Sequence, residues 1–134
     1  MTDPPTALLD TSVFIARESG RPLSVQLLPE RLAVSVITVA ELQAGVLIAA
    51  DTATRSRRMA TLGIVADIAP LPVDEAVAQH WATMRVQLAE ARRRAGVNDL
   101  WIAATAMAND LPVATQDDGF DVFTETCGLA VIRV

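Results

Sequence analysis

The chain has 134 residues, of which 51% are hydrophobic, and this is enough for one ordinary domain over residues 1–134 with a real core. Its net charge of −5 excludes a general nucleic-acid-coating protein, because positive surface dominates phosphate binding. No apolar run approaches the length of a membrane span, and the N-terminal MTDPPTALLD carries an acid where a secretory signal carries basic residues, so we expect a cytoplasmic protein.

Strands and helices are expected to alternate in the first half of the chain. Short apolar runs predict strands over residues 7–9, 32–36 and 68–71. Helical spacing of apolar residues predicts helices over residues 13–19, 38–50 and 52–66. Prolines within and beside the third strand favour an edge position for it.

The second half continues the alternation. A long amphipathic helix is predicted from Asp74 to Arg94, and a second helix follows with Asn98 as N-cap and Asp99 as its first residue. Two further strands are predicted over residues 111–115 and 129–134, with QDDGF as a turn after the first of them. This order indicates an α/β fold with a mostly parallel sheet covered on both faces, in which sites form beyond the carboxyl ends of the strands.

Four acidic residues are expected near that edge. Asp10 follows the first strand, and Asp117 lies two residues after Thr115 at the end of a later strand. Asp99 stands at the head of a largely apolar helix, and Glu41 shares a helical face with small apolar residues, so its side chain is expected to point inward.

Each acid also has a local explanation. Asp10 fits an Asx turn, and the first-turn position of Asp99 suits the helix dipole. Thr38 and Glu41 have the spacing of a capping box. Asp117 belongs to an ordinary Asp-Asp-Gly turn sequence.

Taken together, the four acids favour a cation site. Carboxylates gathered at one end of a sheet repel one another, so they either raise their pKa values or bind cations, and oxygen ligands suit Mg²⁺ or Mn²⁺. Bound cations would also present a positive face to phosphate despite the acidic chain. No His-Cys site competes: His80, the only histidine, is assigned to packing, and Cys127, the only cysteine, to a small thiol that makes no internal disulfide.

Four segments resemble, in order, the motifs of PIN-domain proteins, specifically the small VapC-like toxin ribonucleases of type II toxin-antitoxin pairs. They read LLDTSVFIA, SVITVAELQAG, NDLWIAATAMANDLPVAT and QDDGF. The resemblance covers nearly the whole chain, and the D-T-S and N-D-x-x-I-A-A-T-A motifs are its most specific parts. Residues 52–94 match mainly in helical character.

The resemblance implies a three-layer α/β/α sandwich with an acidic pocket for one or two Mg²⁺ or Mn²⁺ ions. By motif, the family's metal-binding and catalytic acids fall on Asp10, Glu41, Asp99 and Asp117. The family varies at the fourth position, where the adjacent Asp118 and, less well, Asp121 are alternatives. Ser12 and Thr115 occupy hydroxyl positions that could orient the carboxylates.

The implied activity is hydrolysis of RNA by a metal-activated water, which leaves a 5′-phosphate and a 3′-hydroxyl. Candidate RNA contacts are Arg92, Arg93 and Arg94, which we expect to end the long helix; cations at a helix C-terminus are the alternative explanation. The resemblance also implies a homodimer and a cognate VapB-like antitoxin. Candidate surfaces for these partners include Val46, Leu47 and Met59.

Three rival classes share parts of this pattern. Receiver domains and haloacid-dehalogenase-like phosphatases also place an Asp after the first strand, but both ordinarily use a lysine, and all 11 basic residues here are arginines. A PIN-like module that binds RNA or protein without cleaving it is the third alternative. The retention of four mutually repelling carboxylates argues against this alternative.

Overall fold

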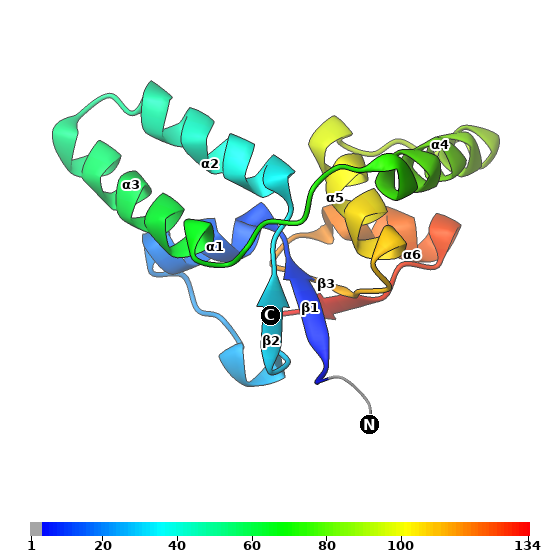
Figure 1. Cartoon of the computed structure of the whole chain (residues 1–134), viewed down its shortest axis with the longest axis horizontal. Coiled ribbons are helices and arrows are strands. Elements are labelled where there is room, and N and C mark those ends of the chain that lie inside the picture. The colour runs from blue at the N-terminus through cyan, green and yellow to red at the C-terminus, as the bar shows by residue number, and fades with distance from the viewer. Residues whose placement is uncertain (1–3) are drawn as a thin grey trace.

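The computed structural model describes residues 4–134 and shows one parallel sheet between two layers of helices (Figure 1). The strands are β1 (Thr6–Leu9), β2 (Arg31–Ala33), β3 (Val113–Thr115) and β4 (Val131–Arg133). The helices are α1 (Thr11–Ser19), α2 (Val36–Ile48), α3 (Thr52–Ala66), α4 (Glu75–Glu90), α5 (Val97–Ala108) and α6 (Asp121–Cys127), with 3₁₀ turns η1 (Val25–Leu27) and η2 (Asp118–Phe120). The sheet order is β2-β1-β3-β4, so the predicted three-layer α/β/α architecture is confirmed.

Alternating side chains of the central strands divide the core between the two faces of the sheet. Ala7 and Leu9 of β1 pack into a cluster with residues of α1, α2 and α3, whereas Leu8 packs into a larger cluster with residues of α4, α5 and α6. This segregation is visible in Figure 1, where α2 and α3 lie on one side of the sheet and α4, α5 and α6 on the other. Among the described residues, no helix combines the length and the apolar character needed to cross a membrane.

The predicted strand over residues 68–71 is wrong. This segment makes a single parallel bridge, between Leu71 and Ser35, in which the Leu71 N–H donates to the carbonyl of Val34 at 2.8 Å. Pro70 and Pro72 have no backbone N–H, so a continued ladder would lack donors on both sides of Leu71. The segment therefore connects α3 to α4 along the sheet without joining it.

The helix predicted from Thr38 begins earlier, at Val36. Ser35 is its N-cap, and the Ser35 hydroxyl accepts a hydrogen bond from the Ile37 N–H at 3.0 Å. Thr38 is therefore already inside the helix and fully buried, which excludes the capping box with Glu41. The Glu41 side chain is left free for a tertiary contact.

Helix boundaries also differ from prediction in the second half. Helix α4 ends at Glu90, four residues before the predicted end, and Arg92 has a φ of 56° in the left-handed region. The N-cap of α5 is Gly96 instead of Asn98, so Asp99 occupies the third helical position instead of the first. Helix α6 was not predicted at all, because its seven residues carry too little periodicity to signal a helix.

Candidate active site

The carboxyl ends of β1 and β3 form the floor of the site. The two strands are parallel and adjacent, and the Asp10 N–H donates to the carbonyl of Ala114 at 3.0 Å, so Asp10 emerges beside the end of β3. Helix α1 begins directly after Asp10, at the same edge of the sheet. This is the edge at which open parallel sheets bind ligands.

Asp10 is almost fully buried, with 3% of its surface exposed, and two hydroxyls hold its carboxylate. Ser12 and Thr115 donate to the same oxygen, Oδ2, at 2.6 and 2.8 Å. Burial raises the pKa of Asp10, the two hydroxyl hydrogen bonds oppose that shift, and the charge of Asp117 adds to it. The Asp10 side chain makes no capping hydrogen bond to α1, and its contacts beyond the local turn include the Thr115 hydroxyl at the end of β3.

Asp99 lies half-buried in the first turn of α5, close to the loop that follows β3. Burial and the charges of Asp10, Glu41 and Asp117 raise the pKa of Asp99 from 3.8 to about 6. A carboxylate placed only to suit the helix dipole would show the opposite shift. The three charge contributions to this shift place Asp10, Glu41 and Asp117 in the neighbourhood of Asp99.

Two glycines make room for the Asp99 carboxylate. A Cβ added at Gly96 would lie 3.1 Å from Asp99 Oδ2, and one added at Gly119 would lie 3.3 Å from the same oxygen. Side chains at both positions would crowd this oxygen. This cradle has no signal in the sequence, because Gly96 and Gly119 are far apart along the chain and each resembles an ordinary loop glycine.

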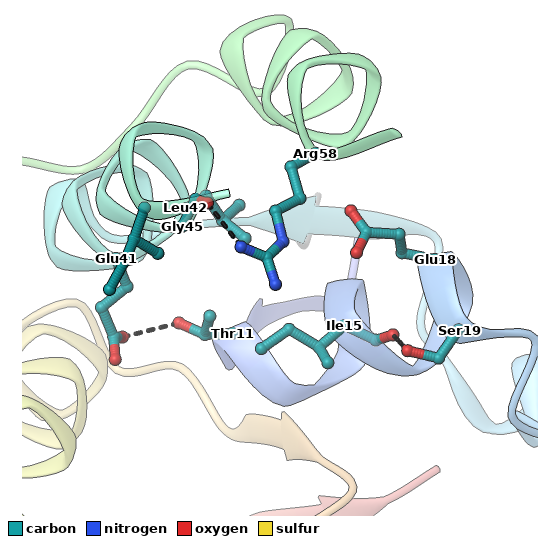
Figure 2. A pocket seen from close by; sticks show the side chains of 9 residues that line it. Thr11, Ile15, Glu18, Ser19, Glu41, Leu42, Gly45 and Arg58 are labelled. Atoms are coloured by element: carbon teal, nitrogen blue, oxygen red, sulfur yellow. Dashed lines mark hydrogen bonds between the residues drawn. The ribbon is translucent and has the colours of Figure 1, made fainter. Parts of the chain in front are cut away.

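Glu41 reaches the site from α2, and Thr11 at the start of α1 fixes it. The Thr11 hydroxyl donates to Glu41 Oε1 at 2.8 Å (Figure 2). The Thr11 hydroxyl oxygen also lies 3.0 Å from that of Thr38. Sequence reasoning missed Thr11 as a supporting residue. The only available signal was its place between Asp10 and Ser12 in the D-T-S motif.

The geometry distinguishes the three alternatives for the fourth acid. Asp117 is exposed, but its charge raises the pKa values of both Asp10 and Asp99, and its N–H donates to the Thr115 hydroxyl at 3.0 Å. Asp118 and Asp121 are instead paired with Arg133: Asp118 makes a close ion pair, and Asp121 lies 3.8 Å from the guanidinium. The geometry thus favours Asp117.

The residue types fit a hard divalent cation, although the site is open. Every candidate ligand is a carboxylate, the donor that Mg²⁺ and Mn²⁺ prefer, and burial together with the charges of three neighbouring acids raises the pKa of Asp99, a combination that a bound cation would offset. Within residues 4–134, no three acidic, His or Cys side chains already lie close enough together to hold an ion. An ion bound here would therefore draw the carboxylates together or take its remaining ligands from water or substrate.

A cavity of about 390 Å³ extends from the acidic site between α1, α2 and α3 (Figure 2). Thr11 and Glu41 lie at one end of it, and Ile15, Leu42 and Ile48 provide apolar walls. The Arg58 guanidinium crosses from α3 and donates to the carbonyl of Gly45 at 2.6 Å.

The apolar residues proposed as a partner surface divide into two groups. The sequence left open whether Val46 belongs to the interface or to the core; the residue is buried and belongs to the core. Leu47 and Met59 are exposed, as is Ile48, which has 78% of its surface accessible. These three side chains give α2 and α3 an exposed apolar face.

The three consecutive arginines do not end a helix, contrary to prediction. They lie in the loop between α4 and α5, directly after the C-cap Ala91, so the alternative explanation as cations at a helix C-terminus stays open. Arg93 makes an ion pair with Glu125 of α6 at 2.6 Å. Arg92 and Arg94 have no acidic partner in residues 4–134.

Comparison with known proteins assigns this fold and site to a class. The family model of the PIN domain matches residues 7–125, and these residues include all four acids. The chain belongs to the PIN-domain family.

Close relatives are ribonucleases of the VapC group. The chain is 53% identical to Ribonuclease VapC5 of Mycobacterium tuberculosis (strain ATCC 25618 / H37Rv), over 99% of this chain and 98% of the relative. It is 41% identical to Ribonuclease VapC4 of the same strain, over 85% of this chain and 88% of the relative.

Solved structures agree with this relationship. The crystal structure of VapBC-5 from M. tuberculosis, a member of the VapBC family of toxin-antitoxin systems, matches with a TM-score of 0.90 at 50% identity, over 98% of this chain and 100% of the other. VapBC-1 from nontypeable Haemophilus influenzae matches with a TM-score of 0.77 at 25% identity, over 96% and 97%.

Proposed function

We propose that this protein is a divalent-metal-dependent endoribonuclease, the toxin of a toxin-antitoxin pair, which hydrolyses RNA phosphodiester bonds at the acidic site. The observation that carries the proposal is the convergence of four carboxylates from four separate segments, in which the charges of three acids add to the burial that raises the pKa of Asp99. The relatives named as ribonucleases support the reaction class. Cleavage of RNA is consistent with the expected cytoplasmic location.

The proposed ligands are Asp10, Glu41, Asp99 and Asp117. Divalent-metal dependence is general to PIN ribonucleases; we propose Mg²⁺, with Mn²⁺ able to substitute. When bound, the ion would supply an activated water and positive charge against the phosphate. The chain's own contribution is orientation: Ser12 and Thr115 hold Asp10, and Thr11 holds Glu41.

The 2′-hydroxyl of RNA has no required role in this chemistry, so a preference for RNA would depend on shape and on contacts outside the acidic site. Arg92 and Arg94 are the arginines of the α4–α5 loop left free for such contacts, since Arg93 is paired with Glu125 within residues 4–134. We expect the products to carry a 5′-phosphate and a 3′-hydroxyl.

We propose a VapB-like antitoxin as the inhibitory partner and a homodimer as the assembly of the toxin. The structural neighbours are VapBC toxin-antitoxin structures, which supports a partner of this type. The cavity beside Glu41 and the exposed face formed by Leu47, Ile48 and Met59 offer apolar surface of the kind that protein partners cover.

The test is inducible expression in a bacterium of the wild type and of Asp99→Asn, followed by mapping of new 5′-phosphate ends across total RNA. We expect growth arrest and new ends with the wild type only, because the substitution removes one of the four carboxylates without changing the size of the side chain. Asp110→Asn is the matched control: Asp110 is exposed and follows the other end of α5, so this variant should cleave normally.

The non-cleaving PIN-like module makes the opposite predictions. If wild-type protein is folded and abundant but yields no new RNA 5′ ends, and calorimetry detects no Mn²⁺ binding, the non-cleaving module is the correct function and the nuclease proposal is wrong. Equal cleavage by the wild type and Asp99→Asn would remove Asp99 from the mechanism while leaving the reaction class intact.

A further inference from the structure

A second cavity, of about 330 Å³, lies where α4 meets the start of α5 and has no role in the metal chemistry. Its walls include Trp81, Arg85 and Leu88 of α4 together with Arg93 and Arg94 of the connecting loop. Three of its eight lining residues are arginines and none is acidic. In a chain with 16 acids and 11 bases, this composition makes the cavity a local site for an anion.

Two of the three arginines are available to a ligand. Arg93 is committed to Glu125 at 2.6 Å, but neither Arg85 nor Arg94 forms an ion pair or a side-chain hydrogen bond within residues 4–134. Both are exposed at the mouth of the cavity. A guanidinium presents a planar fork of donors that matches the oxygens of a phosphate group.

Trp81, one of a stacked pair of tryptophans, forms the aromatic wall of the cavity. Trp81 stacks on Trp101 of α5, with ring centroids 4.9 Å apart and planes inclined by 17°. The stack fixes the Trp81 ring against α5. The Trp81 Nε1–H is buried and is the one such buried side-chain group in residues 4–134 without a hydrogen-bond partner. This atom has almost no accessible surface, so Trp81 contributes an apolar wall to the cavity and the arginines contribute its donors.

The cavity adjoins the acidic site through the first turn of α5. Val97 and Leu100 line it, while Asp99 on the same turn belongs to the carboxylate cluster. Gly96, where an added Cβ would lie 3.1 Å from Asp99 Oδ2, directly follows Ala95 of the cavity wall. One short segment, residues 95–100, therefore carries residues of both sites.

We propose that the cavity between α4 and α5 binds a backbone phosphate of the RNA strand, flanking the bond to be cleaved, through Arg85 and Arg94. This inference rests on the proposed ribonuclease function. RNA is favoured over an acidic peptide because a polynucleotide supplies a phosphate at every residue, so a strand held at the acidic site presents further phosphates to neighbouring positive sites. The cavity thus positions the strand, and the acidic cluster performs the reaction.

The test measures binding of a fluorescein-labelled, mixed-sequence single-stranded RNA by anisotropy over a range of NaCl concentrations. The binding protein is full-length Asp99→Asn, so that cleavage does not interfere. Adding Arg85→Gln and Arg94→Gln together should weaken binding about tenfold at about 0.1 M salt. The slope of log K against log salt should become shallower by about 0.7 for each phosphate that the protein no longer neutralises.

Arg31→Gln in the same background is the matched control. Arg31 is exposed and lies at the start of β2, at the opposite edge of the sheet from the acidic site. It should leave both affinity and slope unchanged. Equal binding by the double variant and the Arg31 control would overturn the proposal, as would a double variant that binds RNA normally but loses binding to a VapB-like antitoxin.

A cleavage assay separates this inference from the proposed function. In the cleavage-competent background, Arg85→Gln with Arg94→Gln should raise KM and leave kcat near the wild-type value, because the contact binds substrate and transition state alike. If the wild type cleaves RNA and the double variant has an unchanged KM, the proposed ribonuclease function is retained and the proposed phosphate binding in the cavity is overturned. RNA binding that depends on both arginines in a wild type without cleavage would support the cavity and overturn the nuclease.

Discussion

The pKa of Asp99 depends on burial and on the other three acids of the site. It has no ion-pair partner in residues 4–134, and burial together with three neighbouring carboxylates raises its pKa to about 6. In the metal-free protein the Asp99 carboxyl is therefore either protonated or ionised against the repulsion of its neighbours, and a divalent cation would stabilise its ionised form. This makes protonation and metal binding competing events at the same carboxylate.

The raised pKa of Asp99 predicts an unusual dependence of stability on pH. Between 3.8 and about 6 the folded state binds more protons than the unfolded state, so the free energy of unfolding should fall as pH rises through this window. Below 3.8 the contribution of Asp99 is fully present, and above about 6 it is lost. The raised pKa of Asp10 acts in the same direction.

Urea unfolding in EDTA, from about pH 4 to about pH 7, measures this effect. In Asp99→Asn, the free energy of unfolding should change less between these two pH values than in the wild type. Near pH 7 the variant should be more stable than the wild type by about 1–2 kcal/mol, allowing for screening by solvent. A variant less stable than wild type near neutral pH would contradict the repulsion.

Thr115 links two of the acids through one hydroxyl. It donates to Asp10 and accepts from the backbone N–H of Asp117. Thr115→Val keeps the shape but removes both bonds, so we expect a loss of about 1–3 kcal/mol in stability and a further rise in the pKa of Asp10. Thr115→Ser should restore the bonds, and a valine variant that equals the serine variant in unfolding and cleavage assays would show that the hydroxyl is dispensable.

At the scale of elements, the site depends on the placement of three helices. Helix α1 begins after Asp10, α2 carries Glu41 past its capped start, and α5 carries Asp99 in its first turn. The side chains of Thr11 and Glu41 join α1 to α2 directly. The relative placement of these helices therefore fixes the distance between the carboxylates.

Thr11→Val tests the link between α1 and α2. Loss of the 2.8 Å hydrogen bond leaves Glu41 free to rotate away from the cluster, so we expect metal-dependent cleavage to fall about tenfold, with a loss of stability of about 1 kcal/mol. Thr11→Ser should retain most of the cleavage activity and most of the stability of the wild type. Cleavage rates at saturating Mn²⁺ and thermal unfolding provide the two readouts; unchanged cleavage in the valine variant would exclude a positioning role.

At the scale of the molecule, an acidic chain with a cluster of carboxylates should be stabilised by the ion it binds. A ligand that binds only the folded state raises stability with its concentration, by about 2.7 kcal/mol at about a hundredfold excess over Kd. We expect Mn²⁺ to raise the Tm of the wild type by several degrees above neutral pH, and less below the pKa of Asp99 of about 6, where that carboxyl is protonated. Scanning fluorimetry of the wild type and Asp99→Asn measures the rise in Tm on addition of Mn²⁺. An equal rise in the two proteins would show that the ion binds away from Asp99.

Much of the fold followed from local pattern. Helix α3 was predicted at its observed bounds, Thr52–Ala66, because its apolar spacing is regular. Helix α6 was not predicted, because it is too short to show a helical period. The end of α4 was placed too late, because the helix stops just before Arg92, whose left-handed backbone conformation has no signal in the sequence. The strand over residues 68–71 failed because apolar content alone does not supply the N–H donors that a ladder needs.

The sequence alone determined the α/β class and the identities of the candidate acids, because period-2 and period-3.6 patterns and motif spacing are local properties. Only the tertiary structure decided that Asp117 couples to Asp10 and Asp99 while Asp118 and Asp121 pair with Arg133. It also joined Thr11 to Glu41 and Gly119 to Asp99. These contacts connect residues distant in the chain, and their energies depend on distance and burial, which a parallel sheet sets when it brings its strand ends to one edge.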